Sequence, residues 1–122
     1  MTARTHSSLF ALAGASALLT LAACGGGSGG GTQVAVSASD TSCTPAMTAL
    51  PPGKTTFVVK NEGKDVTELY VLRKDDSLVS EVENIGPGTS RKLTVDLTAG
   101  DYTLQCKPGQ LGDGIRTPIK VA

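Results

Sequence analysis

The chain has 122 residues, and its 11 Lys and Arg balance its 11 Asp and Glu, so the formal net charge is zero. No run of like charge is longer than two residues, which argues against nucleic acid as a partner. The single histidine, His6, lies near the N-terminus, so the rest of the chain has no imidazole to act as a hydrolytic base or as a ligand of a blue-copper centre. We therefore expect a protein that is not an enzyme.

The N-terminal segment has the features of a lipoprotein export signal. Arg4 precedes an apolar stretch, and Leu21-Ala22-Ala23-Cys24 has the form of a lipobox, in which the thiol of Cys24 receives a diacylglycerol and cleavage after Ala23 makes Cys24 the mature N-terminus. The stretch 9–23 is shorter than the roughly 20 apolar residues that cross a bilayer as a helix. The sequence therefore predicts a lipoprotein signal peptide over residues 1–23, and a lipidated Cys24 with a Gly/Ser linker over residues 24–31. It also predicts an extracytoplasmic location, periplasmic or on the outer face, with a lipid anchor in the cell membrane.

Residues 32–122 are predicted to form one small domain built from strands. Alternation of apolar and polar residues is clearest over 92–97, where Leu93, Val95 and Leu97 share one face. No stretch shows about ten or more residues of helical periodicity. Turn-forming residues at 51–53, 61–63, 74–76, 86–88 and 99–101 separate the apolar runs. In chain order, strands are predicted around 34–36, 56–60, 66–73, 92–97, 102–106 and 119–121, which is typical of an all-β, two-sheet sandwich.

Several of these segments resemble a known family. Thr-Ala-Gly-Asp-Tyr-Thr-Leu-Gln-Cys (98–106) and Pro-Pro-Gly-Lys-Thr-Thr-Phe (51–57) resemble cupredoxins. Cys-Thr-Pro (43–45), Thr-Glu-Leu-Tyr-Val-Leu (67–72) and Glu-Val-Glu-Asn-Ile-Gly-Pro-Gly (81–88) are similar to the cupredoxin-like domain of EfeO-type iron-uptake lipoproteins. The resemblance covers residues 32–122 and implies a cupredoxin-like Greek-key β-sandwich of about seven strands.

The same resemblance implies a metal site and a partner. In that family the domain is thought to bind copper or ferric iron through two cysteines and nearby acidic side chains. EfeO proper continues into a helical imelysin-type domain, whereas this chain ends at Ala122, which implies a separate helical imelysin-type partner or a membrane iron permease. Tyr70 stands where the family often has a second glutamate. Carried over to this sequence, the implied metal ligands are Cys43, Cys106, Glu68, Glu81 and Glu83.

The two cysteines allow two interpretations. Cys43 is predicted to lie in a polar loop, and Cys106 at the end of a strand with its side chain toward the core. Two cysteines in a small exported domain usually form a disulfide. The alternative is a pair of thiolates that binds a soft metal ion with the help of a carboxylate.

The glutamates also allow two interpretations. Glu81 and Glu83 are two residues apart on an extended segment, so their side chains project from the same face. Together with Glu68 they would form an oxygen-rich patch suited to hard cations such as ferric iron or calcium. The alternative is that they are ordinary solvated residues on the outer face of a sheet.

These observations predict a membrane-tethered, extracytoplasmic metal-binding module for copper or iron, without a type-1 copper centre, that contributes to metal uptake or handling. The alternative is a disulfide-stabilised β-sandwich lipoprotein that binds a protein or envelope partner without metal. The redox state of the two cysteines and the exposure of the three glutamates distinguish the two functions.

Overall fold

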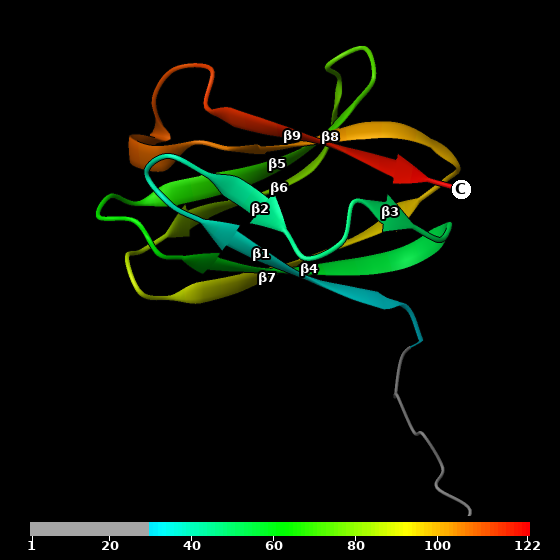
Figure 1. Cartoon of the computed structure of the whole chain (residues 1–122), viewed down its shortest axis with the longest axis horizontal. Coiled ribbons are helices and arrows are strands. Elements are labelled where there is room, and N and C mark those ends of the chain that lie inside the picture. The colour runs from blue at the N-terminus through cyan, green and yellow to red at the C-terminus, as the bar shows by residue number, and fades with distance from the viewer. Residues whose placement is uncertain (1–29) are drawn as a thin grey trace, which may run out of the picture.

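The computed structural model describes residues 30–122, which contain nine strands and one short 3-10 helix, η1 (Figure 1). The predicted signal peptide and the Cys24 lipidation site lie outside the described residues. Within residues 30–122, no helix is long and apolar enough to cross a membrane. In chain order the elements are β1 (Thr32–Ala38), β2 (Cys43–Pro45), β3 (Ala49–Leu50), β4 (Gly53–Asn61), β5 (Thr67–Arg73), β6 (Leu78–Ile85), β7 (Ser90–Leu97), β8 (Gly100–Cys106), η1 (Pro108–Gln110) and β9 (Ile115–Val121).

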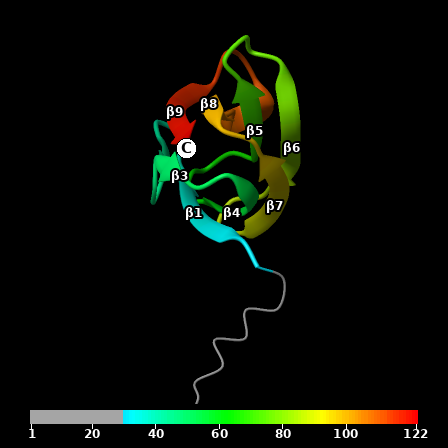
Figure 2. The same cartoon turned by 90° about the vertical axis from the view of Figure 1, so that its right-hand side faces the viewer.

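The strands form two mixed sheets that face each other (Figure 2). The four-stranded sheet has the order β2-β1-β4-β7, and the five-stranded sheet has the order β3-β9-β8-β5-β6. Two pairs are parallel, β1 with β4 and β3 with β9, while the other pairs are antiparallel. The chain enters the domain at Thr32, at the end of the sandwich opposite to the end where Ala38 pairs with Cys43 (Figure 1).

The core lies between the sheets and is built from Val, Leu and Ile, with one buried phenylalanine, Phe57. Because side chains alternate between the two faces of a strand, every second residue points into this core. On β7, for example, Leu93, Val95 and Leu97 are buried while the intervening residues are exposed. The side chain of Asn61 is also buried. Its Nδ2 donates to the backbone oxygens of Asp65 and Ile85, both at 2.7 Å, and so gives these two carbonyls a hydrogen-bond partner where β4 ends.

The prediction of an all-β, two-sheet sandwich is confirmed, and the seven longer strands account for the expected number. The structure adds β2 and β3, of three and two residues, which are too short to show any period in the sequence, and it makes β6 of the segment in which 81–83 was predicted only to be extended. Two local predictions were wrong. Cys43 is the first residue of β2 and is buried, because it pairs with Ala38 instead of lying in a loop. Gly100 and Asp101 begin β8 rather than forming only a turn, because they pair with Val121 and Lys120 of β9.

Candidate functional site

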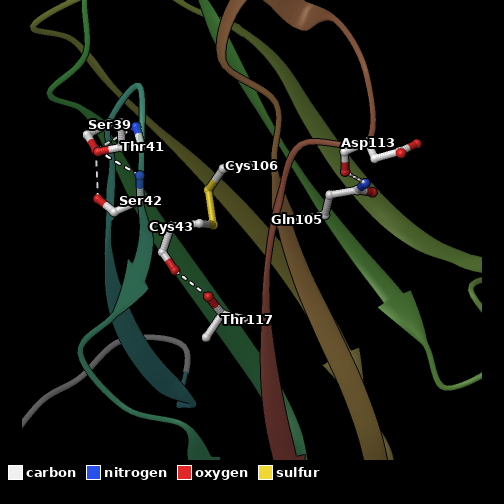
Figure 3. The surroundings of a disulfide bond; sticks show 8 residues. All are labelled: Ser39, Thr41, Ser42, Cys43, Gln105, Cys106, Asp113 and Thr117. Carbon is white, nitrogen blue, oxygen red and sulfur yellow. Dashed lines mark hydrogen bonds between the residues drawn. A yellow bond between two sulfur atoms is a disulfide. The ribbon is translucent and has the colours of Figure 1, made fainter.

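A disulfide joins the two sheets at one end of the sandwich (Figure 3). Cys43 begins β2 in the four-stranded sheet and Cys106 ends β8 in the five-stranded sheet, and their Cα atoms are 5.6 Å apart. Both side chains are buried, with relative exposures of 3% and 0%. The hydroxyl of Thr117 on β9 donates to the backbone oxygen of Cys43 at 2.5 Å. Of the two interpretations of the cysteines, the structure therefore has the disulfide, and in this form neither sulfur is a thiolate that could bind a soft metal.

Strand β5 places Glu68 and Tyr70 on the outer face of the five-stranded sheet. Side chains alternate along a strand, and those of Thr67, Leu69 and Val71 face the core, so the residues between them point outward. Glu68 is nevertheless only 8% exposed. The phenolic hydroxyl of Tyr70 donates to Oε2 of Glu68 at 2.5 Å. An outward-facing carboxylate is thus held in one orientation and largely shielded from solvent.

Glu81 and Glu83 lie beside this pair. Glu81 stands directly opposite Tyr70 in the β5–β6 ladder, and both β6 glutamates are exposed. The pKa of Tyr70 is raised well above its ordinary value, first because its hydroxyl donates to Glu68, then because of burial, and then because of the negative charges of Glu68, Glu81 and Glu83. The phenol therefore stays protonated, and three carboxylates influence a single hydroxyl.

The segment after β8 folds over this end of β5. The amide of Lys107 donates to the backbone oxygen of Glu68 at 3.1 Å, and the amide of Gly109 donates to that of Val66 at 2.8 Å. Nζ of Lys107 lies 5.0 Å from the centroid of the Tyr70 ring, within the range of a cation–π contact. These contacts explain why Glu68 is buried although it points away from the core.

A glycine secures the end of the same loop. Gly114 has a φ of 65°, and a Cβ at this position would collide with the backbone oxygen of Cys106. The side-chain amide of Gln105 donates to the backbone oxygen of Asp113. The loop from Lys107 to Gly114 is therefore fastened against β8 at both of its ends.

The five predicted ligands divide into two groups on opposite sides of the five-stranded sheet. Cys106 pairs with Leu69 and faces the core with Cys43, whereas Glu68 is on the outer face, where it is joined to Tyr70. Over residues 30–122, no three His, Cys, Asp or Glu side chains are gathered closely enough to hold a metal ion. Because Glu81 and Glu83 are exposed, their side chains are free to change rotamer toward a bound cation.

Tyr70 was not among the residues predicted for the site. The sequence contained the signal, because Tyr70 and Glu68 are two residues apart on a predicted strand and must therefore share a face. The burial of Glu68 had no such signal, since it depends on a loop that follows almost forty residues later, from Lys107 onward.

The residues present do not fit a type-1 copper centre. Such a centre requires two imidazoles and a thiolate with a weak axial ligand. The only histidine of the chain is His6, and both cysteines of the domain are in the disulfide. The donor groups that do lie together are carboxylate and phenol oxygens, which suit hard cations.

Comparisons with known proteins agree with this architecture. The chain is 38% identical over 74 residues to proteins called "Iron uptake system component EfeO" from Escherichia coli K12 and Shigella flexneri; these residues are 61% of this chain and 20% of each relative. The chain thus matches about a fifth of the length of these relatives. The predicted resemblance to the cupredoxin-like domain of EfeO-type proteins is confirmed.

Solved structures share the fold. Auracyanin from Roseiflexus castenholzii superposes with a TM-score of 0.60 at 16% identity, covering 77% of this chain and 99% of that one. Auracyanin A from Chloroflexus aurantiacus, described as a "blue" copper protein, superposes with a TM-score of 0.54 at 12% identity, covering 75% and 98%. Residues 9–114 match the family model described as "Cupredoxin-like domain". The chain therefore belongs to the cupredoxin-like family.

Proposed function

We propose that this protein is a membrane-tethered, extracytoplasmic module that binds iron as cargo and contributes to its uptake. The observation that supports this best is the buried Glu68, held by the hydroxyl of Tyr70, with Glu81 and Glu83 beside it on the same sheet. The similarity to EfeO, which is named as an iron-uptake component, supports the same class of cargo.

Ferric iron fits the available donor atoms better than copper. While Cys43 and Cys106 are joined, the domain offers no thiolate, and no imidazole is present in it. Carboxylate oxygens suit hard cations, whereas copper sites in proteins are built mainly from imidazole and sulfur. We therefore assign Glu68, Glu81 and Glu83 as the ligands of the cation, and the cysteine pair to the stability of the fold.

The proposed location is consistent with the disulfide, because such bonds persist in oxidising compartments outside the cytoplasm. The proposed lipid on Cys24 would hold the domain by the end at which β1 begins. The acidic patch, formed by Glu68, Glu81 and Glu83, is on the other sheet, and Glu68 lies at the disulfide end of the sandwich, because its neighbour Leu69 pairs with Cys106. A strand of seven residues such as β1 separates the two ends by about 20 Å. Cargo would then be accessible from the side away from the lipid. A membrane iron permease or a separate helical imelysin-type protein would receive it, with no chemical reaction on this chain.

The test is a titration of the full chain with ferric citrate, with binding followed by equilibrium dialysis. Glu68→Gln keeps the acceptor for the Tyr70 hydroxyl but removes the charge, so the affinity for ferric iron is expected to fall by at least about tenfold. Glu62→Gln is the matched control, because Glu62 is an exposed glutamate that accepts from Ser37 of β1, a strand of the other sheet.

Equal affinities of the parent, Glu68→Gln and Glu62→Gln would remove Glu68 from the site. If the parent itself bound neither ferric iron nor cupric ion, the metal-binding function would be wrong. The disulfide-stabilised sandwich that binds a protein or envelope partner would then be the better account, since the disulfide joins both sheets without any metal.

A further inference from the structure

The two sheets have four edges, and three of them are protected against pairing with another chain. The edge strands β2 and β3 have only three and two residues, and β2 ends in a proline. The edge strand β6 has two irregularities in its pairing with β5, and its exposed side chains include Glu81 and Glu83. Short strands, prolines, bulges and charged side chains are the features that prevent edge strands from associating.

The fourth edge, β7, is long, has no proline and no bulge, and of these features carries only charged side chains, those of Arg91, Lys92 and Asp96. Its eight residues pair with β4 without any shift in register, from Ser90 opposite Lys60 to Leu97 opposite Gly53. The strand contains no proline or glycine, and from Lys92 to Leu97 it alternates between exposed and buried residues. An edge of this length and regularity is a template for another strand.

The pattern of hydrogen bonds between β4 and β7 shows which backbone groups of β7 point away from β4, to the free edge. The amide of Asn61 donates to the backbone oxygen of Thr89 at 2.9 Å and its carbonyl accepts from Gly88 at 2.8 Å, so the backbone groups of Asn61 face the β7 side in the phase of a hydrogen-bonded pair. In an antiparallel ladder such pairs alternate with non-bonded ones, so Leu93 and Val95 bond to β4. The amides and carbonyls of Lys92, Thr94 and Asp96 therefore point to the free edge.

The side chains of these three residues are complementary to the same three side chains on a second copy of the strand. Lys92 and Asp96 are exposed and lie at equal distances on either side of Thr94. If a second copy is placed antiparallel with Thr94 opposite Thr94, each Lys92 faces an Asp96 and each Asp96 faces a Lys92. Opposite charges directly across an antiparallel pair are stabilising.

We propose that β7 is a self-association surface, where two copies of this chain pair antiparallel about a twofold axis through Thr94 and join their four-stranded sheets into one. In the same pairing Leu93 of each copy, 7% exposed, stands opposite the equally buried Val95 of the other. Glu68 is on the outer face of the other sheet and is not part of the pairing strand. Pairing along a single strand buries little surface, so the dimer is expected to be weak and reversible.

Charge exchange tests this proposal. Lys92→Glu puts a glutamate opposite Asp96, and Asp96→Lys puts two lysines opposite each other, so each variant alone is expected to dimerise about tenfold more weakly than the parent. A mixture of the two variants restores opposite charges across the pair and is expected to dimerise better than either variant alone. Sedimentation equilibrium of the full chain in density-matched detergent measures all four samples.

Cross-linking tests the register independently. Hydrogen-bonded residues across an antiparallel pair have Cα atoms about 5.5 Å apart, within the span of a disulfide. Thr94→Cys is therefore expected to form a covalent dimer on oxidation beyond any seen for the parent. Lys92→Cys and Asp96→Cys are expected to do so only when mixed, because each faces the other residue.

Two results would overturn the proposal. One is a parent chain that remains monomeric at its highest soluble concentration, with no additional covalent dimer from Thr94→Cys. The other is a mixture of Lys92→Glu and Asp96→Lys that associates no better than either variant alone.

Discussion

Tyr70 and Glu68 form the most distinctive contact in the domain, because a buried carboxylate on the outside of a sheet is held by a phenol in an adjacent outward position. The hydrogen bond fixes the carboxylate, and the protonated phenol adds no charge of its own. In the proposed site Tyr70 is a positioning residue, and Glu68 is the group that contacts the cation.

The raised pKa of Tyr70 is directly measurable. Tyr102→Phe leaves Tyr70 as the only tyrosine of the chain, and its absorbance at alkaline pH is expected to change well above the ordinary pH of about 10 at which tyrosines ionise. Because the folded state binds this proton more tightly than the unfolded chain does, the associated stability is fully present below a pH of about 10. It is lost as the pH rises through the pKa of the folded state.

Glu68→Gln in the Tyr102→Phe background is the control for this titration. Removing the charge that Tyr70 contacts should bring the ionisation back toward the ordinary tyrosine value. A Tyr70 that ionises at the ordinary pH in the folded Tyr102→Phe variant would contradict the geometry described for the Glu68–Tyr70 pair.

At the scale of elements, the disulfide connects β2 to β8 and so links strands from different sheets. The cysteines are 63 residues apart, and closing a loop of this length contributes about 4 kcal/mol on the chain-entropy model. The double variant Cys43→Ser, Cys106→Ser is expected to lose about this much of the free energy of unfolding, as measured by urea denaturation. The ferric iron affinity of the still-folded variant should be unchanged. A loss below about 1 kcal/mol would show that the disulfide is not the main support of this end of the sandwich.

The elements also show how far the sequence alone could predict the fold. β4, β5, β7, β8 and β9 were predicted because alternation and β-branched residues persist along each of them. β2 and β3 could not be predicted, since strands of three and two residues have no detectable period. The pairing of Cys43 with Cys106 remained one of two alternatives, because it depends on which strands become neighbours.

At the scale of the whole molecule, the residues predicted as metal ligands lie on two different faces of the five-stranded sheet. The sequence predicted a thiolate pair helped by a carboxylate and an oxygen-rich patch of glutamates, but a sheet has two faces, and the cysteines and the glutamates occupy different ones. Glu68 and Cys106 lie on adjacent strands, but their side chains point to opposite faces of the sheet. Alternation within each strand could not show this, because it also depends on the register between β5 and β8.

The molecule then has three separate regions. The chain enters at the start of β1, the acidic patch lies toward the opposite end on the five-stranded sheet, and the free β7 edge belongs to the four-stranded sheet. Attachment, cargo binding and self-association would each use a different region, and the last two are neighbours, because the guanidinium of Arg91 on β7 donates to the backbone oxygen of Glu83 on β6.

The central claim is that the cation is bound by oxygen atoms on the outer face while the disulfide stays closed. X-ray absorption at the iron edge, recorded on the full chain loaded with ferric iron and purified without reductant, tests it most directly. The account predicts a first coordination shell of oxygen neighbours alone. Sulfur neighbours in that shell would contradict it, because they would show that Cys43 and Cys106 open to bind the metal as thiolates.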